Sequence, residues 1–249
     1  MAQTAAGDIR VVDVDDRTSW PSTISDQVAE WIEHAPADVE HSDELDLPAN
    51  AEAAMRTHLN GYRIRVYHCT RLLPHEVQTI ETVGLRPLTP ALIADRLDAA
   101  AAHGCLTADE REWLGANDVY TLRNSHGRAN RVCLTSPRSL FDHYASGARP
   151  LLSTWGGEAI YWGAERNPAI IERLRTVGRP SIVVVNLDLS AAAVNVHPGL
   201  SPLFVAVALA LERPGADIFY KGPVPAANIV GIWQPGNPEY DRHTKLPRA

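Results

Sequence analysis

A histidine and a threonine two residues apart are the first side chains of this sequence that could bind a ligand together. His68 and Thr70 end the segment Tyr62–Thr70, which we expect to be a β-strand. Residues i and i+2 of a strand point to the same face, so His68 and Thr70 can reach one ligand while Tyr67 and Cys69 face the other side. An imidazole and a hydroxyl offer both donors and acceptors, which match the hydroxyl groups of a ribose.

The predicted strand is followed by a helix whose two ends are marked in the sequence. Pro74 opens the helix, apolar residues recur as far as Val83, and Gly84 stands where the helix should stop. Leu85 follows directly. Strand, helix and Gly-Leu therefore form one compact unit.

This unit, Tyr67-His68-Cys69-Thr70 with a helix that ends before Gly-Leu, resembles the first strand and helix of the His-type ADP-ribosyltransferase superfamily. That superfamily includes diphtheria-toxin-like toxins, poly(ADP-ribose) polymerases, DNA-modifying ADP-ribosyltransferase toxins and RNA 2′-phosphotransferases. The resemblance implies that NAD is bound as a substrate and that His68 and Thr70 hold its ribose. It also places His68 among the catalytic residues.

A second similarity to the superfamily is the segment Val132–Ser136, a predicted strand that leads into a helix. Members of the superfamily carry an aromatic residue on this strand, which stacks on the nicotinamide, whereas this sequence has Cys133 or Leu134 there. We therefore expect the aromatic contact to come from elsewhere in the chain, and the candidates are Phe141, Tyr144 and Trp155.

Two carboxylates are candidates for the catalytic acid. Asp217 lies in Ala216–Tyr220, which is similar to the late strand that carries the catalytic glutamate of the superfamily. Glu158 follows Gly156 and Gly157, and glycines allow a backbone to approach a ligand closely. Cleavage of the nicotinamide–ribose bond builds positive charge on the ribose, which a fixed carboxylate can stabilise. A salt-bridged or helix N-terminal acid is the alternative interpretation of Glu158.

Two arginines are candidates for the pyrophosphate of NAD. A guanidinium binds phosphate oxygens in a bidentate way, which suits Arg71 and Arg86, with a surface role as the alternative. The cysteines Cys69, Cys105 and Cys133 lack the paired spacing of a zinc site or a disulfide framework, so no metal is expected. The sequence contains no Walker loop and no Gly-x-Gly-x-x-Gly fingerprint.

Acidic residues are concentrated at the start of the chain. Residues 1–56 contain thirteen Asp or Glu and three Arg, which leaves residues 57–249 with about +3 of a total of −7. A mildly basic remainder suits an anionic small ligand such as a dinucleotide, but not a dedicated nucleic-acid binder. We therefore divide the chain into an acidic extension with short helices, residues 1–60, and an ADP-ribosyltransferase-like domain, residues 61–249. The extension could mask the site, bind a partner protein or keep the chain soluble.

The order of the predicted elements indicates the fold class. Apolar strands over Ser181–Leu189, Ala216–Tyr220 and Ile229–Trp233 follow a largely helical stretch, without regular alternation. This order predicts an α+β fold rather than a doubly wound sheet. The resemblance refines it to a split antiparallel or mixed sheet with helical insertions. No segment reaches the length of about eighteen apolar residues that a membrane helix needs, and no secretion signal is visible, so we expect a cytoplasmic protein without membrane contact.

Three functions are compatible with these observations. NAD-dependent ADP-ribosyl transfer to a protein, nucleic acid or small molecule is the favoured one, in a bacterial toxin or defence effector. RNA 2′-phosphotransfer on the same fold would need a cluster of arginines around a phosphate, while the sequence shows only scattered arginines. A catalytically degenerate module that binds a nucleotide or a partner protein is the non-enzymatic alternative.

Overall fold

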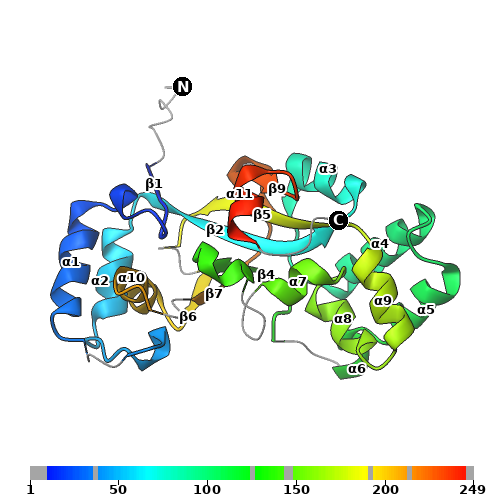
Figure 1. Cartoon of the computed structure of the whole chain (residues 1–249), viewed down its shortest axis with the longest axis horizontal. Helices are drawn as coiled ribbons and strands as arrows, with labels where there is room; N and C mark the ends of the chain where they lie inside the picture. Colours follow the sequence, from blue (N-terminus) through cyan, green and yellow to red (C-terminus); the bar gives the residue numbers. More distant parts are fainter. Residues whose placement is uncertain are drawn as a thin grey trace.

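The computed structural model of the chain describes residues 10–35, 39–123, 127–142, 148–189, 193–211 and 215–244. The described residues form an α+β fold, as the sequence predicts, in which a mixed seven-stranded sheet lies between two groups of helices (Figure 1). A second, two-stranded sheet joins β3 (Gly84–Leu85) to β8 (Val224–Pro225). Among the described helices, none is both long and apolar enough to cross a bilayer.

Strand β2 (Tyr62–Leu72) lies at the centre of the large sheet. It pairs antiparallel with β5 (Arg179–Leu187) on one side and with β4 (Arg131–Ser136) on the other, and it runs parallel to β1 (Arg10–Val12). The other strands are β6 (Val194–His197), β7 (Ala216–Lys221) and β9 (Ile229–Trp233), and the order is β6-β7-β4-β2-β5-β9. The three strands that carry the predicted motifs, β2, β4 and β7, are therefore neighbours.

The two halves of the sheet separate between β2 and β4. Strand β2 is in register with β5 from Ile64 to Leu72, whereas its register with β4 is confined to Tyr67 opposite Thr135. At the start of β4, the amide of Leu88 donates to the carbonyl of Arg131 at 2.9 Å. The carbonyl of Arg131 therefore bonds to the loop at Leu88 and not to β2, and a gap opens between β4 and the second half of β2.

The first group of helices consists of α1 (Ser22–Ile32), α2 (Ala51–His58) and α10 (Leu200–Ala208), at the left of Figure 1. Apolar residues of these helices share one hydrophobic core with the sheet: Val12, Trp20, Ile24, Val28, Met55, Val66, Val185 and Phe204. The sequence predicts an extension over residues 1–60. In the structure, helices α1 and α2 of that segment pack in the main core with the sheet, and its strand β1 pairs with β2.

The second group of helices, at the right of Figure 1, has a hydrophobic core of its own. Its members are α4 (Pro90–Ala102), α5 (Ala108–Ala116), α6 (Val119–Arg123), α8 (Glu158–Ala164) and α9 (Pro168–Thr176). A third, smaller cluster of buried residues forms around Tyr67 and includes Phe141, Leu152 and Tyr240 from segments 138–142, α7 (Arg149–Ser153) and α11 (Pro238–His243). Opposite faces of β2 are therefore buried against different parts of the chain.

Helix α3 (Pro74–Val83) has the boundaries that the sequence predicts. It begins at Pro74, and Gly84 ends it with φ of +98°. A Cβ atom at this glycine would lie 1.9 Å from the carbonyl oxygen of Val224, so only glycine fits between the helix and β8. Pairing of β3 with β8 therefore depends on this position and closes one side of the gap near β2.

We predict that Trp20→Ala lowers the free energy of unfolding by about 3–5 kcal/mol, because it removes a buried aromatic from the main core. Trp20 is 7% exposed, its ring packs edge-on against Phe204 at 4.8 Å, and its indole nitrogen donates to the carbonyl of Asp13 at 3.1 Å. Urea denaturation measures the loss. Trp162→Ala, at a side chain that is 37% exposed, is the matched control and should cost far less; equal losses would show that the N-terminal segment is not part of the core.

Candidate functional site

The imidazole of His68 is held in one tautomer by the neighbouring strand. Its Nδ1 atom lies 2.8 Å from the carbonyl oxygen of Cys133, and because a carbonyl only accepts, Nδ1 must carry the hydrogen. Burial lowers the pKa of His68, the bond to Cys133 opposes that shift, and the positive charge of Arg96 adds to it. His68 is therefore neutral at pH near 7, with a free lone pair on Nε2.

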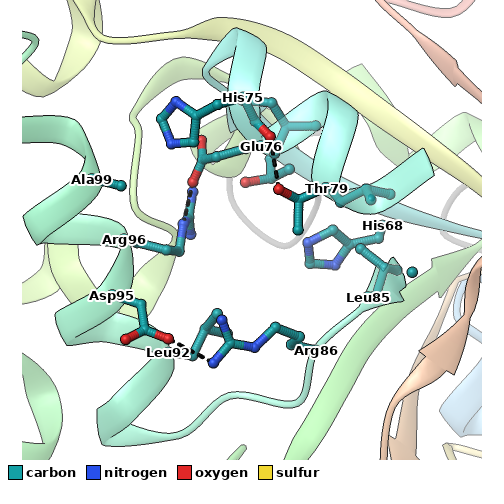
Figure 2. A pocket seen from close by; sticks show the side chains of 14 residues that line it. His68, His75, Glu76, Thr79, Leu85, Arg86, Leu92, Asp95, Arg96 and Ala99 are labelled. Atoms are coloured by element: carbon teal, nitrogen blue, oxygen red, sulfur yellow. Dashed lines mark hydrogen bonds and ion pairs between the residues drawn. The ribbon is translucent and has the colours of Figure 1, made fainter. Parts of the chain in front are cut away.

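His68 and Thr70 line the same cavity, which we call the first cavity (Figure 2). It has a volume of about 240 Å³ and lies between β2, α3 and α4. Figure 2 shows the ring of His68 pointing into this space, with Thr79 above it and Arg86 below. The Thr70 side chain is only 4% exposed, and its hydroxyl makes a long 3.3 Å bond to the carbonyl of Arg71. An acceptor nitrogen and a hydroxyl thus face one cavity from one strand.

A buried ion pair forms the opposite wall of the first cavity. Glu76 accepts from Nε of Arg96 at 2.6 Å, from the Leu73 amide at 2.8 Å and from the indole of Trp155 at 3.1 Å. Burial alone would raise the pKa of Glu76, but Arg96 and these donors bring it below its ordinary value. Glu76 therefore stays ionised and fixes Arg96 beside His68.

Arg96 retains hydrogen-bonding capacity despite this ion pair. Its Nη2 atom is buried and has no hydrogen-bond partner in the described part of the chain. A buried donor without a partner costs about 1–3 kcal/mol, and more when it is charged. Arg96 lines both the first cavity and its neighbour, so an anionic or polar ligand there would remove this cost.

A second cavity, of about 130 Å³, continues from the first and brings in Glu158. The two cavities share six lining residues: His68, Thr70, Leu85, Arg86, Leu92 and Arg96. Glu158 is the first residue of α8, after Gly156 and Gly157 with φ of +98° and +66°. A Cβ atom on Gly156 would lie 2.6 Å from the Cβ of Ile160, so the glycine allows this turn to pack tightly. Of the two predicted acids, only Glu158 shares a cavity with His68.

Glu158 also forms a salt bridge, which is the alternative role that the sequence suggests for it. Arg128 forms a close ion pair with its carboxylate. Burial raises the pKa of Glu158, the charge of Arg128 opposes this, and Asp217 adds to the increase. A partly buried carboxylate with one fixed cation beside it can either stabilise positive charge or exchange a proton.

Four arginines surround the second cavity, although they are scattered in the sequence. They are Arg86, Arg96, Arg128 and Arg131, and the only acid among the described lining residues is Glu158. Three of these arginines have a carboxylate partner, as in the pair between Arg86 and Asp95 at 2.7 Å. The positive excess around this cavity favours an anion such as a pyrophosphate.

Asp217 lies on the other face of the sheet from His68. Tyr67 is in register with Thr135, and Thr135 with Asp217, so these three side chains share a face. His68 is one residue away from Tyr67 and points the opposite way. Asp217 instead lines a third cavity, of about 550 Å³, together with Glu158. The structure therefore separates the two predicted acids: Glu158 lines both the second and the third cavity, whereas Asp217 lines the third but not the second.

The other predicted ligand residues have different placements. Arg71 is buried, and its guanidinium donates to the carbonyls of Val177, Leu152 and Gly178 at 2.6–3.3 Å, so it ties the chain together rather than binding phosphate. Trp155 is fully buried and lines none of the described cavities, which removes it as an aromatic contact for a ligand. Phe141 is likewise buried against Tyr67. Tyr144 lies outside the described residues.

Sequence reasoning missed Glu76 and Arg96, and it considered Arg128 only as part of a polar loop that could contact substrate. Glu76 had a local signal. It is the third residue of α3, and a glutamate at that position accepts from the amide of the N-cap residue, here Leu73. The pairing of Arg96 with Glu76 and of Arg128 with Glu158 joins positions 20 and 30 residues apart, for which no short-range pattern exists.

The described residues contain no group of three or more His, Cys, Asp or Glu side chains placed to hold a metal ion. Comparison of the chain with protein-family models, with curated proteins and with solved structures found no match. The geometry of the cavities is therefore the basis for a functional proposal.

We predict that the stability of the protein falls less steeply between about pH 7 and about pH 5.5 in His68→Asn than in the parent chain. The pKa of His68 is lowered in the folded state, so the unfolded state takes up this proton first as the pH falls. Stability from this group is complete above the ordinary value of about 6.5 and is lost below it. Asparagine can donate to the Cys133 carbonyl but does not titrate. Urea denaturation at several pH values measures the slopes, and identical slopes would contradict a neutral imidazole at this partly buried position.

Proposed function

We propose that the protein is an ADP-ribosyltransferase-like enzyme that cleaves NAD and transfers ADP-ribose to an acceptor. One observation carries the proposal: the neutral imidazole of His68, the hydroxyl of Thr70 and the carboxylate of Glu158 line a single cavity at the gap between β2 and β4. This is the set of groups that a ribose and its departing base require.

Binding of the dinucleotide follows from the polarity of the lining. Nε2 of His68 accepts from a ribose hydroxyl, and the hydroxyl of Thr70 can donate or accept beside it. Arg96, with its unpartnered Nη2, and Arg86 lie at the boundary of the first and second cavities and suit the pyrophosphate. The first cavity, lined by Leu72, Ile80, Leu85 and Leu92, offers apolar surface to the adenosine end.

The chemistry of the step assigns a role to Glu158. The bond between ribose C1′ and the nicotinamide nitrogen breaks, and its electron pair leaves with the nicotinamide, which becomes neutral. Positive charge develops on the ribose, and the carboxylate of Glu158 stabilises it in the second cavity. Arg128 holds that carboxylate in place. His68 acts on the ribose hydroxyls as an acceptor and orients the sugar.

The arrangement of the sheet supports the same proposal. The segments that resemble the superfamily's first, second and late motifs fall on β2, β4 and β7, which are adjacent. The sheet separates between the first two of these strands, as a split sheet would. By the resemblance, Asp217 on β7 would stand where the superfamily has its glutamate. The proposal instead assigns the role of the acid to Glu158, the first residue of α8.

RNA 2′-phosphotransfer is a second candidate, and the arginines favour it. That reaction needs several cations around a phosphate, and the fold brings four scattered arginines to the second cavity. Three of the four are already paired with Glu76, Asp95 or Glu158, which reduces the charge available to an RNA phosphate. Transfer of the phosphate of a 2′-phosphorylated RNA to the ADP-ribose of NAD, with release of nicotinamide, would identify this activity.

We predict that Glu158→Gln lowers nicotinamide release from NAD by about 100-fold or more, with little change in NAD affinity, because it removes charge stabilisation in the transition state. Asp217→Asn should have a much smaller effect on release in the absence of an acceptor. The assay uses NAD labelled in the nicotinamide ring, and the opposite ranking of the two variants would transfer the acid's role to Asp217.

We also predict that His68→Ala and His68→Asn both weaken NAD binding by about five- to tenfold, the value of one hydrogen bond. Asparagine retains a donor for the Cys133 carbonyl and lacks the Nε2 acceptor, so it separates ligand contact from structural support. Calorimetric titration with NAD measures both affinities. If His68→Asn binds NAD as tightly as the parent chain does, His68 only supports the Cys133 carbonyl and does not contact NAD. If no form of the protein binds NAD, the proposed function is wrong.

A further inference from the structure

The third cavity is the largest of the three and differs from the others in charge. Its volume is about 550 Å³. Its described lining residues include three carboxylates, Glu158, Glu165 and Asp217, and one cation, Arg128. The second cavity has the opposite balance, with four arginines and one acid. A cavity with a negative excess attracts a cation and repels the phosphates of a nucleic acid.

The second and third cavities meet at Glu158. They share five lining residues: Cys69, Arg128, Cys133, Leu151 and Glu158. A group bound in the third cavity would therefore approach the carboxylate beside which, in the proposed function, the nicotinamide–ribose bond breaks. It would come from the side of the sheet opposite to His68, because Asp217 and Phe219 line the third cavity from that face.

Aromatic side chains complete the lining of the third cavity. Tyr161 and Trp162 meet edge to face, with ring centroids 6.5 Å apart, and Phe219 of β7 also lines the cavity. Trp162 is 37% exposed, and Glu165 and Asp217 are also exposed, so the cavity opens to solvent. Carboxylates beside aromatic rings favour a guanidinium over an ammonium, since a planar, weakly hydrated cation can stack on a ring and also bind carboxylates.

We infer that the third cavity receives the acceptor of the reaction, and that the acceptor is the guanidinium of an arginine side chain. The inference rests on the proposed function, because it requires NAD cleavage in the second cavity. In the step, a guanidinium nitrogen bonds to ribose C1′ as nicotinamide leaves with the electron pair of the broken bond. The proton lost by that nitrogen passes to the carboxylate of Glu158 and then to solvent.

The test begins without NAD, on the full chain. N-acetyl-arginine methylamide is titrated by NMR, with the citrulline compound as a neutral probe of the same shape. We expect the citrulline compound to bind about tenfold more weakly, because it lacks the charge. Glu165→Gln and Trp162→Ala should each weaken arginine binding by about two- to fivefold. The inference is overturned if the two probes bind equally, or if neither substitution weakens arginine binding.

The second stage adds labelled NAD and an arginine-containing peptide, its lysine counterpart or an oligonucleotide. Mass spectrometry should find ADP-ribose on the arginine peptide alone, with transfer reduced in Glu165→Gln and nicotinamide release without acceptor unchanged in that variant. Modification of the oligonucleotide or of the lysine peptide instead would overturn the inference. If NAD is not cleaved but the arginine probe binds with the expected dependence, the proposed function fails and the cation site stands.

Discussion

The bond from His68 to the carbonyl of Cys133 joins two strands at the point where their backbones separate. Strands β2 and β4 are in register at Tyr67 and Thr135. Beside this pair, the imidazole of His68 donates to the Cys133 carbonyl in place of a backbone amide. This partly buried carbonyl accepts from the imidazole, so the ring is fixed in orientation and in tautomer. The rest of the candidate site depends on this constraint, because it leaves an acceptor nitrogen facing the cavities.

Around this bond the fold separates charge into distinct compartments. Arginines gather at the second cavity and carboxylates at the third, and the ion pair of Glu158 and Arg128 lies where the two meet. In the low dielectric of a partly enclosed space such a gradient is stronger than the same charges would produce in water. Under the proposed function, this gradient would orient the substrate before contact, with its anionic pyrophosphate toward the second cavity and a cationic acceptor in the third.

Much of the local structure could be predicted from the sequence, and most of the site could not. Strand periodicity placed His68 and Thr70 on one face, and proline and glycine marked both ends of α3. The face of the sheet on which Asp217 lies depends on the register of β7 with β4, and a slip of one residue would reverse it. The sequence of β7 alone therefore cannot predict that face. The partners Glu76 and Arg96 meet only because α3 and α4 fold onto the same strand.

The surroundings of Trp155 have a practical consequence. Its indole donates to Glu76, and the guanidinium of Arg96, which bonds the same carboxylate, lies 4.9 Å from the centre of its ring. Since a cation and a carboxylate close to an indole both alter its excited state, any molecule that draws Arg96 toward the first cavity changes the light this buried tryptophan emits. The fluorescence of Trp155 can therefore report on ligands that enter the first cavity.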